Sequence, residues 1–213
     1  MLQKYLGYCI VCVLLFYTKQ VNAQYDSTRN HLMIVPHYLA FNGMRIDYEL
    51  KIKNNHWIQL CPQFYFKENN SSSDDNISPI SITNNNTNTS LRRLFGVGLD
   101  AYHKIYLGIS YRQPGAFISY GASANYFEIE YADEGNVSQT STSSFSKIGG
   151  DVIIGYDLGF KKNLIIFGIY TGLGYRYSFT NNSQIKKNFT RSMYDYAYSG
   201  NIFLIGFRFG TKF

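Results

Sequence analysis

The sequence predicts an all-β protein built as one antiparallel β-barrel, and three observations predict it. Aromatic residues make up 17% of the 213-residue chain, while charged residues make up only 16%, against about 25% in an average soluble domain. Apolar and polar residues alternate in short runs, and the polar side of these runs is rich in glycine. Such runs favour strands over helices, and the composition excludes a disordered chain. The length fits a single barrel domain.

The N-terminus has the features of a secretory signal. Lys4 supplies a positive charge, residues 8–17 form a short apolar run, and residues 21–23 end in a small residue at the expected cleavage site. The apolar run is too short for a membrane-spanning helix. We therefore expect residues 1–23 to be a cleaved signal peptide and residues 24–213 to form the barrel domain.

Charge and cysteine content narrow the function further. Removal of Lys4 and Lys19 with the signal lowers the formal charge from +6 to +4, and the remaining charges form no basic block. Nucleic-acid binding therefore has no support. Cys9 and Cys12 leave with the signal, so Cys61 has no partner for an intramolecular disulfide. No cysteine directly follows the cleavage site, which argues against a lipid anchor.

The first expected strand covers residues 32–41. Asn42 and Gly43 follow it, and this pair is a strong signal for a two-residue hairpin. Pro36 is the weak point, because proline removes a donor from the ladder. The alternative is one kinked strand over residues 32–52, which would change the parity of the strand count.

The next three expected strands cover residues 44–53, 56–67 and 92–106, and residues 104–113 could lengthen the third of them. Residues 44–53 alternate most regularly, because every odd position is charged and every even position is apolar or aromatic. Successive side chains of a strand point to opposite faces. Each of these strands therefore has one apolar and one polar face.

The last four expected strands cover residues 116–131, 145–159, 164–179 and 199–213. The final two carry glycine and arginine on one face and aromatic or aliphatic residues on the other. In residues 116–131 small polar residues mark one face while two glutamates fall on the other, so the faces of this strand stay unassigned. The eight strands give the even number that single-chain membrane barrels have.

Alternation alone fits either a soluble sandwich or barrel, or a transmembrane barrel. Runs of about ten residues or more match a tilted strand that crosses a bilayer. The apolar faces end in aromatic residues, and the glycine-rich polar face suits a narrow lumen. Short connections near 53–55, 113–115 and 161–163 alternate with long ones near 68–90, 132–144 and 180–198. This asymmetry favours a transmembrane barrel with short periplasmic turns.

The C-terminal strand carries the most specific signal. Phe213 ends the chain and is preceded at alternate positions by Phe209 and Phe207. With the pattern over residues 32–213, this strand resembles the small outer-membrane β-barrels of Gram-negative bacteria, of OmpA/OmpX-like architecture and close to uncharacterised barrels of the Bacteroidota. The resemblance implies an outer-membrane location, contact with lipid and lipopolysaccharide, and recognition of the C-terminal strand by the barrel assembly machinery.

The polar faces predict a charged lumen. An eight-stranded barrel is just wide enough for side chains to fill, and unpaired charges there would be costly. We therefore expect the lumen charges to pair with one another, with a narrow pore as the alternative. The expected lumen charges are Arg45, Asp47, Glu49, Lys51, Asp100, Lys104, Asp151, Asp157, Arg176 and Arg208.

No enzyme, cofactor or metal site is predicted. Some barrels of this class modify lipid A with a histidine and a serine, and His103 lies on the expected lipid face, but no nucleophile is positioned beside it. The acidic residues Glu128, Glu130, Asp133 and Glu134 match no calcium loop, so a solvated rim is expected. The expected function is a structural or surface-interaction role, with pore and lipid A-modifying enzyme as alternatives and the extracellular ligand unknown.

Overall fold

The computed structural model describes residues 29–68, 89–107, 115–133, 140–159, 164–180 and 196–213. The expected signal peptide at residues 1–23 lies outside these residues, as does most of the long connection expected at 68–90. The proposed lengthening of a strand through residues 108–113 also lies outside them.

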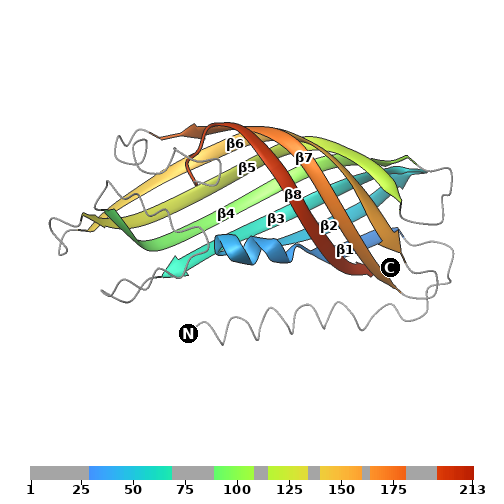
Figure 1. The fold of residues 1–213 in the computed structure, drawn as a ribbon, viewed down its shortest axis with the longest axis horizontal. Coiled ribbons are helices and arrows are strands. Elements are labelled where there is room, and N and C mark those ends of the chain that lie inside the picture. Colours follow the sequence, from blue (N-terminus) through green and yellow to red (C-terminus); the bar gives the residue numbers. More distant parts are fainter. Residues whose placement is uncertain (1–28, 69–88, 108–114, 134–139, 160–163, 181–195) are drawn as a thin grey trace.

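The described chain forms a closed antiparallel barrel of eight strands in sequence order, which confirms the predicted fold class (Figure 1). Every strand pairs with its neighbour along the chain, and β8 returns to pair with β1. The strands are β1 Asn30–Ile34, β2 Gly43–Lys53, β3 His56–Glu68, β4 Thr89–Tyr106, β5 Ala116–Asp133, β6 Thr140–Gly159, β7 Ile165–Phe179 and β8 Gly200–Lys212.

The first strand is shorter than the sequence predicted. β1 ends at Ile34, and residues Pro36–Phe41 form a 3₁₀ helix, η1. Ile34 lies opposite Phe209, so a continued strand would place Pro36 beside β8, where it has no N–H to donate. The expected strand over residues 32–41 is therefore wrong beyond Ile34.

The expected two-residue hairpin at Asn42 and Gly43 is also wrong. Asn42 adopts a left-handed conformation with φ 54° and ends η1 instead. The kinked-strand alternative fails as well, because β1 and β2 are separate antiparallel strands. The even count of strands therefore stands.

The barrel has two different ends. We call the end where β2 meets β3 the turn end. There the Asn30 and Arg29 amides both donate to the Phe213 carbonyl at 3.0 and 3.1 Å, which ties the C-terminus to β1. The opposite end, where η1 joins β1 to β2, we call the loop end. β4, β5 and β6 are the longest strands of the barrel.

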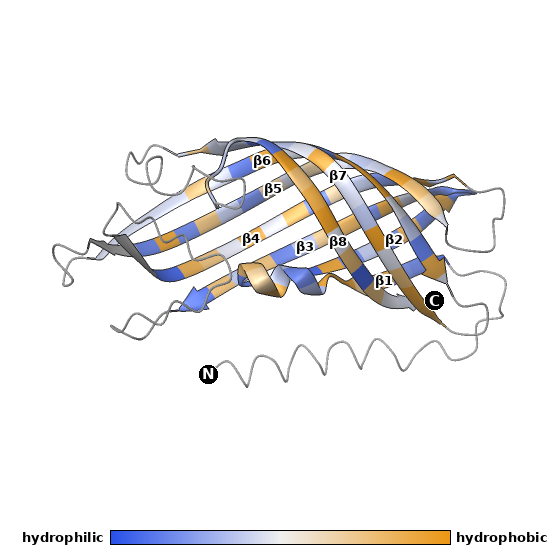
Figure 2. Cartoon of the chain, viewed as in Figure 1, coloured by the Kyte–Doolittle hydropathy of each residue, from blue (hydrophilic) through white to orange (hydrophobic). Residues whose placement is uncertain are grey.

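Hydrophobic and hydrophilic residues alternate along much of the wall (Figure 2), and buried and exposed positions alternate along the strands. β5, whose faces the sequence left open, turns Ser119 and Ser123 inward together with Phe117 and Phe127. Glu128 is exposed on its outer face. β5 therefore has both apolar and polar side chains on its inner face, whereas the buried charges of the barrel come from the inner faces of β2, β4, β6, β7 and β8.

Candidate functional site

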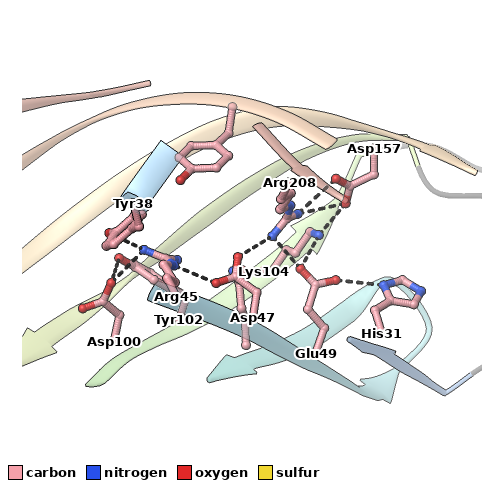
Figure 3. A network of polar contacts seen from close by, with 12 residues as sticks. His31, Tyr38, Arg45, Asp47, Glu49, Asp100, Tyr102, Lys104, Asp157 and Arg208 are labelled. Atoms are coloured by element: carbon pink, nitrogen blue, oxygen red, sulfur yellow. Dashed lines mark hydrogen bonds and ion pairs between the residues drawn. The ribbon is translucent and has the colours of Figure 1, made fainter. Parts of the chain in front are cut away.

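The barrel interior holds a network of buried charged side chains (Figure 3). Of the expected lumen charges, only Lys51 is half-buried rather than buried. The remaining ones come from β2, β4, β6, β7 and β8, and the parity of the strands points them all inward. They are Arg45, Asp47, Glu49, Asp100, Lys104, Asp151, Asp157, Arg176 and Arg208.

Two cations and two carboxylates form the centre of this network. Lys104 Nζ lies 2.7 Å from Glu49 and 2.6 Å from Asp157. Arg208 lies 2.9 Å from the same Glu49 oxygen and 3.0 Å from Asp157. Each carboxylate therefore meets two cations, so no charge in this group is left without a counter-charge.

Asp47 connects this centre to the next group of charges. Its carboxylate accepts from Arg45 Nε at 2.6 Å and from Gln59 at 2.8 Å, and Arg208 lies 3.4 Å away. Arg45 also donates to Asp100 at 2.9 Å. Asp47 thus lies between two guanidinium groups that belong to different parts of the network.

The network continues toward the loop end through a tyrosine. The Tyr102 hydroxyl lies 3.1 Å from Asp100 and 2.8 Å from Asp151. Arg176 donates to both oxygens of Asp151, at 2.8 Å through Nη2. Such two-point arginine–carboxylate pairs are among the stronger charge-assisted contacts.

His31 ends the network toward the turn end. Its Nδ1 lies 2.9 Å from Glu49, and its ring stacks on Trp57 with centroids 4.3 Å apart. His31 is buried. One continuous series of polar contacts therefore runs from His31, through the central group, to Arg176.

Among the described residues the buried charges do not cancel if every carboxyl is ionised. Four buried cations face five buried carboxylates, and the half-buried Lys147, whose ammonium lies over the interior Phe127 ring, adds a positive charge to the inner face of β6. The carboxylates are Asp47, Glu49, Asp100, Asp151 and Asp157, and the cations are Arg45, Lys104, Arg176 and Arg208.

A tyrosine of η1 supports the network from inside the barrel. Arg45 donates to the Tyr38 hydroxyl at 3.1 Å. Burial raises the pKa of Tyr38 to about 12, so its hydroxyl stays protonated at neutral pH. The helix that replaces the end of β1 therefore contributes a neutral acceptor to a charged arginine.

Apolar and aromatic side chains fill the rest of the interior. The cluster toward the loop end includes Tyr196, whose hydroxyl donates to the Phe41 carbonyl at 2.9 Å and whose pKa is raised by burial. It consists of Leu94, Phe127, Ile129, Phe145 and Ala197, with Tyr65 and Tyr196 against it. A second cluster consists of Trp57, Cys61, Tyr102, Tyr106, Phe117, Ile153 and Tyr170.

Glycine on the inner face makes room for the ion pairs. A Cβ on Gly168 would collide with the Asp157 carboxylate and would come within 2.9 Å of Arg208 Nε. The glycine-rich polar face of the sequence therefore has a steric reason, since the wall must approach the charged side chains closely.

Sequence reasoning missed the neutral and histidine members of the network. Tyr102 and Tyr106 share the inward parity of Asp100 and Lys104, and Tyr106 donates to Asp157 at 2.6 Å. The two-residue alternation of side chains along a strand was therefore enough to predict that both tyrosines point inward. His31 lies before the expected start of the first strand, so no strand pattern covered it.

The remaining sequence candidates lie outside this network. Phe207 and Phe209 are exposed on the outer face of β8, and Phe213 is half-buried. At the acidic candidate, Glu130 is half-buried and Asp133 is the last residue of β5. Glu134 lies outside the described residues.

His103 is half-buried on the outer face of β4. Its Nδ1 lies 2.7 Å from the Tyr120 hydroxyl and its Nε2 lies 3.1 Å from His56 Nδ1. In the described part of the chain, no group of three or more His, Cys, Asp or Glu side chains is arranged to hold a metal ion. The free Cys61 is buried.

Two comparisons with known proteins found no match to this chain. No protein-family model matches the chain, and no curated protein matches it. No helix among the described residues has the length and apolar character to cross a membrane.

Proposed function

We propose that this protein is an outer-membrane β-barrel with a lumen filled by side chains, which acts through its presence in the envelope or through its extracellular loops. One observation carries the proposal, namely that the charges are buried inside and the large apolar side chains are exposed outside. In a soluble protein, a contiguous exposed apolar surface of this kind would drive aggregation.

The outer surface has the chemistry of a lipid contact. Ile205 is 71% exposed and Leu173 is 67% exposed, and every strand from β2 to β8 contributes exposed aromatic or aliphatic side chains. Transmembrane barrels have this apolar outer band with alternate residues turned into a polar interior. Lipid would cover the band and remove its contact with water.

The filled interior supports a role other than transport. The ion pairs and the two apolar clusters occupy the space between opposite walls. Opening a water path would require breaking buried ion pairs, each of which loses several kcal/mol when one partner is left alone. We therefore propose a closed barrel rather than a pore.

The location and partners follow as part of the same proposal. The turn end would face the periplasm and the loop end the outside, as in barrels with short periplasmic turns. Lipid and lipopolysaccharide would surround the wall. The C-terminal strand with Phe207, Phe209 and Phe213 would be read by the barrel assembly machinery of a Gram-negative cell.

Refolding of residues 24–213 into detergent, followed by planar-bilayer recording, tests this proposal. We expect a folded band whose gel migration changes on boiling, and no discrete current steps after reconstitution. Failure to fold into any detergent or lipid would contradict a membrane barrel.

Stable current steps from the folded band would contradict the closed lumen instead. In that case Asp151→Asn and Arg176→Gln, which remove opposite partners of one ion pair, would show whether the current passes the lumen charges. A lipid A-modifying activity that depends on His103 would contradict the non-enzymatic role.

A further inference from the structure

Three polar side chains meet on the outer surface of the barrel, away from the interior network. His56 begins β3, His103 lies near the end of β4, and Tyr120 lies opposite His103 on β5. Both histidines are half-buried and Tyr120 is 49% exposed. The group lies at the turn end, next to the exposed turn residue Asn54, so water and dissolved ions reach it.

The two imidazole rings are nearly parallel, and one nitrogen of each ring lies close to the other ring. His56 Nδ1 and His103 Nε2 are 3.1 Å apart. The ring planes differ by 11° and the ring centroids are 5.2 Å apart, farther than the facing nitrogens. The two nitrogens thus face each other, and only one of them holds a proton when they form a hydrogen bond.

Tyr120 determines which nitrogen of His103 is free. Its hydroxyl lies 2.7 Å from His103 Nδ1. When Nδ1–H donates to this hydroxyl, the neutral ring leaves the Nε2 lone pair directed at His56. A hydrogen bond from the second ring nitrogen to an outer partner is the usual arrangement of a metal-binding histidine.

The separation of the two nitrogens fits a shared metal ion. Two imidazole nitrogens at about 2.05 Å from one metal lie roughly 3.3 Å apart in a tetrahedral site and about 2.9 Å apart in a right-angled one. The observed 3.1 Å lies between these values. Both lone pairs converge on one ion when each turns by roughly 40° away from the line between the two nitrogens.

We propose that His56 and His103 together bind one divalent transition-metal ion, with Tyr120 as the residue that positions His103. The ligand class is the borderline ions that imidazole prefers, Cu²⁺, Ni²⁺ and Zn²⁺. With two protein ligands the ion keeps open positions for water. The ion takes the place of the proton that the two rings share.

The proton balance of this exchange is defined. Before binding, His56 holds its proton on Nδ1 and donates it to His103 Nε2. On binding, Nδ1 loses that proton to water, Nε2 of His56 gains one from water, and both rings stay neutral. Binding at a pH where both rings are neutral therefore releases no net proton.

Calorimetric titration of the detergent-refolded barrel, without an affinity tag, with Ni²⁺ and with Cu²⁺ tests the proposal. We expect one ion per barrel and, because no net proton is released, the same observed heat without any correction for buffer ionisation in buffers of different ionisation enthalpy at pH 8. Copper electron-spin resonance should show two coordinated nitrogens. His56→Gln and His103→Gln should each weaken binding at least tenfold.

Matched variants separate this site from adventitious binding. Tyr120→Phe should weaken binding about 10-fold, the lower part of the range for loss of an outer partner, whereas Tyr126→Phe on the same strand should leave it unchanged. His37→Gln, in η1 at the loop end, should also leave it unchanged. Because all these residues lie off the central network, heat-modifiable migration should confirm that each variant folds.

Two results would overturn the proposal. One is wild-type binding no stronger than that of the double variant His56→Gln/His103→Gln. The other is one-to-one binding that survives in that folded double variant, which would place the ion elsewhere on the chain.

Discussion

At the scale of single residues, the interior charges depend on one another. Lys104 and Arg208 each contact both Glu49 and Asp157. Such a group contributes little net stability, because the unfavourable free energy of removing four charges from water nearly equals the favourable free energy of their pairing. Its main effect is to penalise any change that leaves one member alone.

Asp157→Asn should therefore destabilise the barrel strongly. The substitution keeps the size of the side chain but leaves Lys104 and Arg208 with only Glu49 as a nearby anion within their shared group. We expect the free energy of unfolding to fall by about 3–5 kcal/mol, as for other broken buried ion pairs. Urea unfolding from lipid vesicles, followed by Trp57 fluorescence, measures this change.

Lys53→Gln is the matched control for that substitution. Lys53 is exposed at the turn end, so its loss should change the free energy of unfolding by no more than about 0.5 kcal/mol. Equal effects of the two substitutions would contradict the role of pairing in the interior.

At the scale of strands, the contact between β8 and β1 is the weakest part of the wall. β8 pairs with β7 along its whole length, but it pairs with β1 only from Phe209 to Lys212. The Phe213 amide donates to β1 and the Lys212 amide donates to the β7 side. By alternation, Phe203, Ile205 and Phe207 point their backbone groups toward η1.

Within the described residues, no hydrogen bond between two backbone groups joins η1 to these positions of β8, and the His37 side chain contacts the Phe207 carbonyl rather than its amide. The amides of Phe203, Ile205 and Phe207 should therefore exchange with deuterium faster than those of Ile202, Leu204 and Gly206, which face β7. Residue-resolved exchange in detergent measures the difference. Equal protection of the two sets would mean that another segment pairs with this edge.

The short β1–β8 contact also predicts a steric limit at Gly210. A Cβ there would collide with the Leu32 carbonyl oxygen and would lie 2.6 Å from the Met33 Cα, both on the backbone of β1. Gly210→Ala should therefore reduce the fraction of barrel that reaches the folded, heat-modifiable band. Gly150→Ala is the control, because its Cβ would meet nothing closer than 3.4 Å.

The alternation of apolar and polar residues predicted most of the strand bounds but not those of β1. From β2 to β8 the expected bounds differ from the observed ones by at most five residues, at the start of β6, because inward and outward residues alternate regularly along each strand. β1 could not be bounded in this way. Its end depends on what Pro36 would meet on β8, and that contact joins residues from opposite ends of the chain.

At the scale of the whole molecule, the alternation of the sequence groups charges on one face of each strand but does not show which of them pair. Parity assigns Arg45 and Asp100 to the interior, yet their 2.9 Å contact depends on the stagger of β2, β3 and β4. The His56–His103 contact was missed for the same reason. The two rings lie diagonally across neighbouring strands, so register rather than residue spacing brings them together.

Because the charges are buried inside the barrel and large apolar side chains are exposed outside, we predict that lipid contacts the outer surface of the wall. Trp57 is the single tryptophan of the chain and is 6% exposed inside the barrel, whereas Ile205 is 71% exposed outside. In vesicles of brominated lipid, the Ile205→Trp variant in a Trp57→Phe background should lose most of its fluorescence, because its indole would contact the acyl chains. Wild-type Trp57 should lose much less.

Iodide in the aqueous phase gives the opposite comparison. It should quench neither tryptophan strongly, since one is buried in the lumen and the other is covered by lipid. Strong iodide quenching of the Ile205→Trp variant together with weak quenching by brominated lipid would mean that the apolar surface faces water. Such a result would contradict the membrane location, because that proposal depends on lipid covering the exposed side chains of β2 to β8.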